Sequence, residues 1–207
     1  MNYLAHLFLA RHSGAAMLGG IMGDFVKADV TGRYPAEIAR EIQLHRYIDS
    51  YTDSHPAVKA SAQLFPEGRR RYAGILLDVF YDHLLSLQWQ RWCDEPRQAM
   101  LDRFYAALTE HEALLPERLR AMAPHMVQLN WLNAYDDFAS VDKAVQRISL
   151  RLSRNGEQLR AGIADLRVHY EGIAAGFDLF FPELVGFAEE RRGRLVAESF
   201  IPSPSNR

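Results

Sequence analysis

The sequence predicts an all-α protein, and three observations lead to that class. Apolar residues recur with the spacing of one helix face along the 207-residue chain, whereas alternating runs of β-branched residues are almost absent. The composition, 48% hydrophobic and 24% charged, is typical of a globular protein. The length suits one well-buried core, and no linker or internal repeat interrupts it. We therefore expect a single-domain helical bundle over residues 1–200, followed by a flexible tail at 201–207.

Capping and breaking residues place the helices in order. Ser13 can cap a second, glycine-rich helix that ends near Gly23. Pro56 should stop the third helix, because the residue before a proline avoids helical geometry. Ser140 is a reasonable cap for a later helix, and Asn155 followed by glycine is a helix-ending signal. The expected helices other than the second span residues 3–11, 36–53, 70–92, 96–112, 116–134, 141–154, 157–176 and 181–200.

Net charge and cysteine content limit the kinds of partner and the cellular compartment that we expect for the protein. A formal net charge of −2 argues against a general nucleic-acid binder. The single cysteine, Cys93, cannot form an internal disulfide, so nothing points to an oxidising compartment. No run reaches the roughly 18 uninterrupted apolar residues that a membrane span needs, and the apolar start lacks a basic leader. We expect a cytoplasmic protein without a membrane partner, and the oligomeric state is left open.

Two pairs of polar residues, each spaced four apart, stand out in these helices. Asp78 and Asp82 lie in the most apolar helix of the chain, where losing water is costly for a carboxylate unless a cation or several donors compensate. His45 and Asp49 have the same spacing, which puts both on one face of their helix. Two such pairs predict the opposite walls of a metal site.

The ligand types indicate which ions this site could hold. Imidazole and carboxylate ligands suit Mn, Fe, Zn or Mg ions, and the absence of clustered cysteines argues against structural zinc. Asp24 follows the glycine-rich segment at a helix end, where its carboxylate can either turn inward to the ion or stabilise a local turn. A structural helix–helix pair is the alternative for His45 and Asp49, and a hydrogen-bonded core histidine is the alternative for His83.

Nearby cations could bind an anionic substrate. Lys27 and Arg46 are candidate contacts for a phosphate beside the ion, since cations stabilise the charge that a phosphate brings; either could instead be a solvated surface charge. No phosphate-binding glycine loop, serine elbow or dinucleotide fingerprint occurs.

Four separated segments of the chain resemble the acyl carrier protein phosphodiesterase family in order and spacing. The similarity is strongest over the first ~90 residues and is general in length and helical character beyond them. The segments are residues 1–7 (MNYLAHL), 19–27 (GGIMGDFVK), 44–56 (LHRYIDSYTDSHP) and 77–83 (LDVFYDH).

This resemblance implies an HD-phosphohydrolase-like, all-helical enzyme that depends on a divalent ion, commonly Mn²⁺, with Mg²⁺ or Fe²⁺ as alternatives. It also implies an activity, which is removal of the 4′-phosphopantetheine arm from holo acyl carrier protein. The chain departs from the usual HD pattern, because Asp82 precedes His83 and no His-Asp dipeptide occurs. The expected metal ligands are Asp24, His45, Asp49, Asp78 and Asp82.

The remaining site residues have expected roles in phosphodiester hydrolysis. A histidine that titrates near neutrality could donate a proton to the departing serine oxygen, and two cations would hold the non-bridging oxygens. The carrier protein is acidic, so a basic face near the site is expected. The candidate proton donors are His6, His55 and His83. The phosphate contacts are Lys27 and Arg46. The candidates for the basic face are Arg69, Arg70, Arg71, Arg118 and Arg120.

Three other functions compete with this hypothesis. A nucleotide or small phosphoester hydrolase of the HD group would use the same ion in a different pocket. A non-catalytic all-α module could bind an acidic protein and use its carboxylates as contacts between helices. A helical di-iron oxidase is less consistent with the chain, because the usual Glu-x-x-His spacing is missing.

Overall fold

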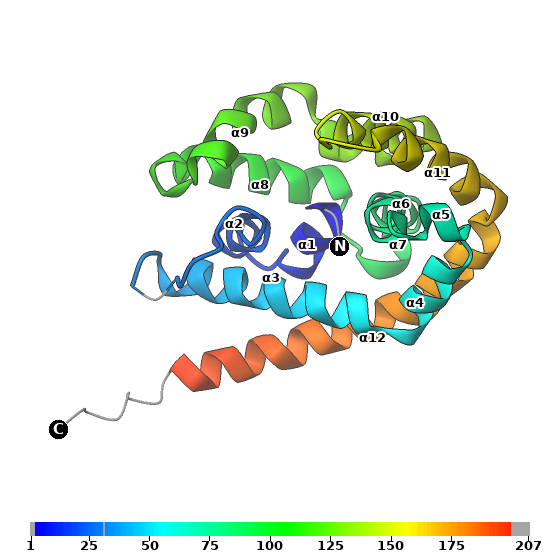
Figure 1. Ribbon diagram of the computed structural model, residues 1–207. Coiled ribbons are helices and arrows are strands. Elements are labelled where there is room, and N and C mark those ends of the chain that lie inside the picture. The colour runs from blue at the N-terminus through cyan, green and yellow to red at the C-terminus, as the bar shows by residue number, and fades with distance from the viewer. Residues whose placement is uncertain (1–2, 31, 200–207) are drawn as a thin grey trace.

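The structure is a computed structural model that describes residues 3–30 and 32–199, and the all-α prediction is confirmed because this part of the chain contains helices and no strand (Figure 1). The expected tail at 201–207 lies outside the described residues. The elements are α1 (Tyr3–Leu9), α2 (Gly14–Met22), α3 (Ala36–Ser54), α4 (Pro56–Gln63), α5 (Glu67–Arg70), α6 (Ala73–Leu87), α7 (Trp89–Trp92), α8 (Arg97–Glu110), η1 (Glu112–Leu114), α9 (Glu117–Leu129), η2 (Trp131–Asp136), α10 (Phe138–Ser149), α11 (Gly156–Val168) and α12 (Tyr170–Ser199).

The helices pack in three layers. In Figure 1, α1, α2 and α6 are seen nearly end-on in the middle, with α3, α4 and α12 below them and α8 to α11 above. Helix α2 packs against α1, α3 and α8, while α6 packs against α1, α10, α11 and η2. The middle layer is therefore covered on both sides, which is why the candidate site lies close to the core.

Helix α1 is the most enclosed element of this middle layer. Every residue from Leu4 to Leu9 is buried. Phe8 contacts the rings of Trp89 and Phe181, which brings α7 and α12 onto the same core. Such enclosure makes a polar side chain on α1 costly unless it has a partner, and this condition applies to His6.

Several predicted helix ends are correct because local capping decides them. The Ser13 hydroxyl accepts a hydrogen bond from the Ala16 amide and so begins α2. Helix α3 ends at Ser54, as Pro56 predicts, but Pro56 also begins α4, a helix that the sequence analysis missed. Proline is well suited to a first helical position, because its missing N–H would have no partner inside the helix.

Other boundaries were predicted wrongly. The expected helix at 70–92 begins only at Ala73 and is divided into α6 and α7. The chain leaves helical geometry between them at Gln88, where φ is −97° and ψ is 12°. Helix α9 stops at Asn130, whose left-handed backbone turns the chain into η2. Asp137, and not Ser140, caps α10.

The longest helix was also misplaced. Helix α12 begins at Tyr170 and continues through Pro182, so the expected break between residues 176 and 181 does not exist. No helix in the described residues combines the length and hydrophobicity that a bilayer crossing requires.

Candidate metal centre

Three neighbouring elements, α1, α2 and α3, bring imidazole and carboxylate groups together. Glycines let α2 approach α3 closely: a side-chain carbon at Gly19 would lie 2.6 Å from the Ile38 carbonyl oxygen. At Gly23 such a carbon would lie 2.2 Å from the Cγ atom of His45. Only a residue without a side chain fits at these positions while the helices stay this close. Gly19 in α2 and Gly23 directly after it thus determine how close α3 and the His45 ring can lie.

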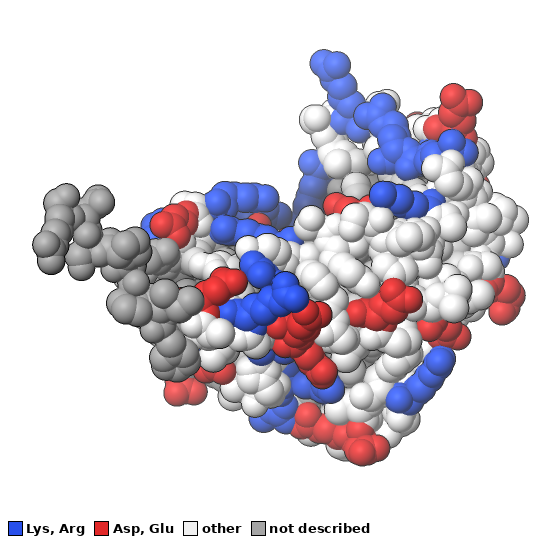
Figure 2. Space-filling view, turned by 90° about the horizontal axis from the view of Figure 1, so that it is seen from below, with Lys and Arg blue, Asp and Glu red and all other residues white. Residues whose placement is uncertain are grey.

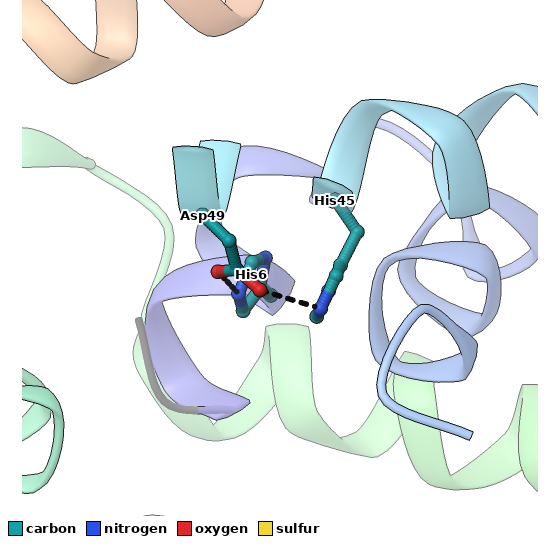
Figure 3. Close-up of side chains that lie close together, drawn as sticks. All are labelled: His6, His45 and Asp49. Atoms are coloured by element: carbon teal, nitrogen blue, oxygen red, sulfur yellow. Dashed lines mark hydrogen bonds and ion pairs between the residues drawn. The ribbon is translucent and has the colours of Figure 1, made fainter. Parts of the chain in front are cut away.

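His6, His45 and Asp49 form the cluster drawn in Figure 3. The two imidazole rings stack with centroids 3.9 Å apart and planes inclined by 20°. One carboxylate oxygen of Asp49 lies 3.2 Å from His6 Nε2, and the other lies 3.1 Å from His45 Nε2. Asp49 therefore bridges two histidines that come from helices far apart in the sequence.

Asp24 adds a second carboxylate at the edge of this cluster. Its Oδ1 atom lies 3.5 Å from His45 Nε2, and its side chain is 44% exposed. Asp49 is also partly exposed, whereas both histidines are buried. The cluster thus has buried nitrogen donors on the inside and carboxylates toward solvent, which leaves a route of access for an ion or a substrate.

Hydrogen bonding fixes which nitrogen of His45 faces the carboxylates. His45 Nδ1 donates to the carbonyl oxygen of Gly20 at 2.7 Å, because a carbonyl can only accept. Nε2 is then directed at Asp24 and Asp49. Metal-binding histidines usually donate their second N–H to a carbonyl or carboxylate in this way, and that bond holds the ring in place.

The four side chains carry an uneven charge. Burial would lower the pKa of His45, but hydrogen bonds to Asp24 and Asp49 outweigh it and raise this pKa to about 9. Burial and the neighbouring His45 charge lower the pKa of His6 to about 4. Burial opposes ionisation of Asp24 and Asp49, yet hydrogen bonds to the histidines lower the pKa of both. At neutral pH two carboxylates face one imidazolium, so the cluster is net negative and attracts cations.

The cluster suits a divalent metal ion. The ligand atoms of His6, His45 and Asp49 all lie within 4.8 Å of one another. Metal–ligand bonds of about 2.0–2.2 Å bring ligand atoms into this range of separations. The proton on His45 Nε2 occupies the direction that such an ion would take. Among the described residues, His6 Nδ1 is a buried nitrogen without a hydrogen-bond partner, whereas Nε2 of the same ring contacts Asp49.

Comparison with known proteins assigns the family. Residues 1–184 match the family model described as acyl carrier protein phosphodiesterase. The chain belongs to the acyl carrier protein phosphodiesterase family. Proteins named acyl carrier protein phosphodiesterase share 33% identity over 193 residues in Pectobacterium atrosepticum, covering 93% of this chain and 100% of the relative. In Klebsiella pneumoniae (strain ATCC 700721) the identity is 34% over 200 residues, with coverage of 93% and 100%. No solved structure matches the chain.

The region that matches the acyl carrier protein phosphodiesterase family includes every residue that the sequence analysis proposed for the site, because all of them precede residue 184. The predicted ligands Asp24, His45 and Asp49 are brought together. His6, expected as a proton donor, lies in the same cluster. The HD-like character of the fold remains a prediction.

The pair on α6 is placed differently. Asp82 is fully buried, and its two oxygens accept hydrogen bonds from the amides of Leu4 and Ala5 at 2.9 and 3.0 Å. Burial raises the pKa of Asp82 to about 7 despite these bonds. The carboxylate therefore caps α1 and holds the helix that carries His6. Asp78 lies outside the three-residue cluster; burial raises its pKa, and the negative charge of Asp49 adds to this effect.

His55 and His83 are both bonded outside the cluster. His55 Nδ1 accepts from the Ala57 amide, and its Nε2 donates to Glu183 at 3.2 Å. His83 Nδ1 donates to the carbonyl oxygen of Tyr135 at 2.6 Å, and its Nε2 accepts from the Tyr170 hydroxyl at 3.3 Å. The structure thus places both as hydrogen-bonded core histidines, the alternative reading given above for His83.

Lys27 lies in the loop that follows Asp24, and Arg46 contacts this loop from α3. Arg46 donates to the carbonyl oxygens of Val26 and Ala28 at 2.8 and 2.9 Å, which ties this loop to α3. Lys27 is exposed in the same loop. The sequence analysis missed the contribution of the Gly20 carbonyl oxygen, because no sequence pattern shows which backbone carbonyl a histidine will meet.

Proposed function

We propose that this chain hydrolyses the phosphodiester between 4′-phosphopantetheine and the serine of holo acyl carrier protein, giving apo carrier protein and 4′-phosphopantetheine. The observation that carries the proposal is the cluster of His6, Asp24, His45 and Asp49 in a chain of this family. A cluster of two imidazoles and two carboxylates is a donor set that metal-dependent hydrolases use.

We further propose that these four residues hold a divalent ion, Mn²⁺ in the first instance and Mg²⁺ or Fe²⁺ as alternatives. Such an ion supplies a Lewis acid that polarises the phosphodiester and acidifies a bound water. Asp49 contacts both histidines, so it would hold the ion together with them. Asp24 lies at the exposed edge, where its position suits a ligand on the substrate side.

The surrounding residues of this chain have supporting roles in the proposal. Arg46 is a positioning residue, since its bonds to Val26 and Ala28 hold the loop that carries Asp24. Lys27 extends from the same loop and suits a contact with a non-bridging phosphate oxygen. Asp82 keeps His6 in place by capping α1. Hydrolysis forms one bond from water oxygen to phosphorus, breaks the bond to serine, and returns a proton to the serine oxygen.

An acidic carrier protein and a cytoplasmic location belong to the same proposal. We propose that the substrate is an acidic carrier protein and that the reaction takes place in the cytoplasm.

The test is incubation of holo acyl carrier protein with the purified chain and Mn²⁺, followed by mass measurement of the carrier protein. We expect conversion to the apo form, and no conversion when a chelator replaces the metal. Asp53→Asn is a matched control on α3, because Asp53 is exposed and lies outside the three-residue cluster. Intact holo carrier protein after prolonged incubation, together with cleavage of nucleotides under the same conditions, would reject this substrate.

A further inference from the structure

A groove lined by cations lies between α9, η2 and α10. Two cavities make it up, of about 730 Å³ and about 300 Å³. Both are lined by Leu129, Trp131, Arg147 and Arg151, so they are parts of one depression. We call this depression the cationic groove.

All the charged side chains that line the cationic groove are basic. They are exposed; three of them belong to α9 and α10, and the fourth, Arg151, lies two residues after the end of α10. No ion pair or hydrogen bond engages these side chains among the described residues, whereas Arg69, Arg97 and Arg192 each bind a carboxylate. Figure 2, seen from below the view of Figure 1, shows a face on which basic and acidic side chains are interspersed. The basic residues of the groove are Arg118, Lys143, Arg147 and Arg151.

The groove adjoins the candidate metal centre through Tyr3. This residue lines the smaller cavity, one turn before His6 on α1, and its ring lies 6.2 Å from that of Trp131. Arg118 lies over the ring of Phe25, the residue next to Asp24, at 5.7 Å. Burial and then the charge of Asp24 raise the pKa of Tyr3, while Arg118 opposes them, so these groups share one electrostatic neighbourhood.

The floor of the groove has the composition of a protein interface. Met122, Leu129 and Trp131 provide apolar surface, and Leu129 is 62% exposed. Methionine, aromatic residues and arginine are enriched in protein interfaces, where an apolar centre is surrounded by a polar rim. A nucleic acid fits the chain less well, because its net charge is −2 and its sequence pI is about 6.4.

We propose that the cationic groove is the docking surface for the acidic face of the carrier protein, an inference that rests on the proposed function. Binding there places an acidic partner beside Tyr3 and the exposed edge of the metal centre. The charge of the groove attracts the acidic partner, and the apolar floor supplies surface to bury. This location differs from the run at Arg69 to Arg71: Arg69 is bound to Asp165, and the groove lining includes neither Arg70 nor Arg71.

Direct binding of apo carrier protein tests the docking surface. The apo form lacks the phosphodiester, so the result does not depend on whether the chain hydrolyses it. We expect Arg147→Glu with Arg151→Glu to weaken binding by about tenfold or more at low salt, with a smaller effect at high salt. The double variant Arg70→Glu with Arg71→Glu introduces the same charge change elsewhere and should bind as the parent does.

Kinetics with holo carrier protein provides a second readout. The groove variant should raise KM far more than it lowers kcat. The milder Arg147→Ala with Arg151→Ala should shift KM in the same direction, and unchanged melting temperatures establish that both variants fold.

Three outcomes would overturn the proposal. The first is a groove variant that binds apo carrier protein as tightly as the parent. The second is an equal loss of binding in the Arg70 and Arg71 control. The third is tighter binding of the parent to anionic lipid vesicles or to single-stranded DNA than to the carrier protein.

Discussion

Two pairs of side chains four residues apart, His45 with Asp49 on α3 and Asp78 with Asp82 on α6, both lie next to α1 but meet different surroundings. The α3 pair faces the side chains of His6 and Asp24. Asp82 instead faces the backbone amides at the start of α1. The difference teaches that helical spacing identifies a shared face, whereas the nearest donors decide whether a carboxylate there is available to a metal ion.

The largest difference between the two pairs is expected at Asp49, the carboxylate that faces the histidines. We expect Asp49→Asn to reduce kcat/KM for holo carrier protein by about a thousandfold, because losing several kcal/mol of transition-state stabilisation has that effect. Mn²⁺ affinity, measured by calorimetric titration, should fall in parallel. Asp53→Asn should leave both quantities close to those of the parent. Full activity of the Asp49→Asn enzyme in the presence of chelator would remove the metal from the proposal.

We expect substitution of Asp82 to lower the stability of the fold more directly than it lowers the rate of hydrolysis. Asp82→Ala leaves two buried amides without an acceptor, so we expect the free energy of unfolding to fall by about 2–4 kcal/mol. Urea unfolding with chelator present measures this loss without metal binding. An Asp82→Ala protein that is as stable as the parent but no longer binds Mn²⁺ would place Asp82 among the ligands after all.

The close contact at Gly23 provides a test that leaves every candidate ligand intact. Gly23→Ala should displace the His45 ring and weaken Mn²⁺ binding by about 10–100-fold, the range found when support for a ligand is lost. Gly186→Ala on α12 is the matched control, because a side chain there has open space around it. If both variants bind Mn²⁺ equally well, the contact does not position His45.

The pH dependence of Mn²⁺ affinity tests His45 without any substitution. His45 has a pKa of about 9 without metal, so a proton competes for Nε2 at neutral pH. We expect affinity to rise about tenfold per pH unit between pH 7 and 9 and then to level off. His6, with a pKa of about 4, is already deprotonated in this range and adds no second step. An affinity that does not change with pH would exclude His45 as a ligand.

The same raised pKa makes a prediction for the metal-free protein. Because folding raises the pKa of His45 above its ordinary value of 6.5, the stabilisation is fully present below about pH 6.5 and is lost as the pH rises through about 9. Thermal melting with chelator present at pH 6, 8 and 10 should therefore show decreasing stability, and His45→Gln should reduce this trend.

Much of the fold followed from local signals. Apolar periodicity indicated the helices, and Ser13 and Pro56 placed two of their ends because caps and prolines act on neighbouring residues. The breaks at Gln88 and Asn130 were missed, since no residue there forbids a helix and packing of the following segments decides the turn. The long α12 was missed because a break was expected between residues 176 and 181, whereas the helix continues from Tyr170 through Pro182.

The candidate site was likewise predictable only in part. Spacing put His45 and Asp49 on one face, and the glycine-rich segment placed Asp24 at a helix end. Spacing could not show that Asp82 would meet the amides of α1, because that depends on how α6 lies against a helix 77 positions earlier. His83 likewise meets Tyr135 and Tyr170, which are remote in the sequence and reach it only through the fold.

The cap that Asp82 places on α1 sets an order of events during synthesis. Helix α1 is synthesised before α6, and the carboxylate that holds its first turn is made 77 to 78 residues later. Until α6 has emerged, the nascent chain carries the groups of α2 and α3 without a fixed His6 beside them. The position of His6 therefore depends on a carboxylate supplied by a helix far along the chain.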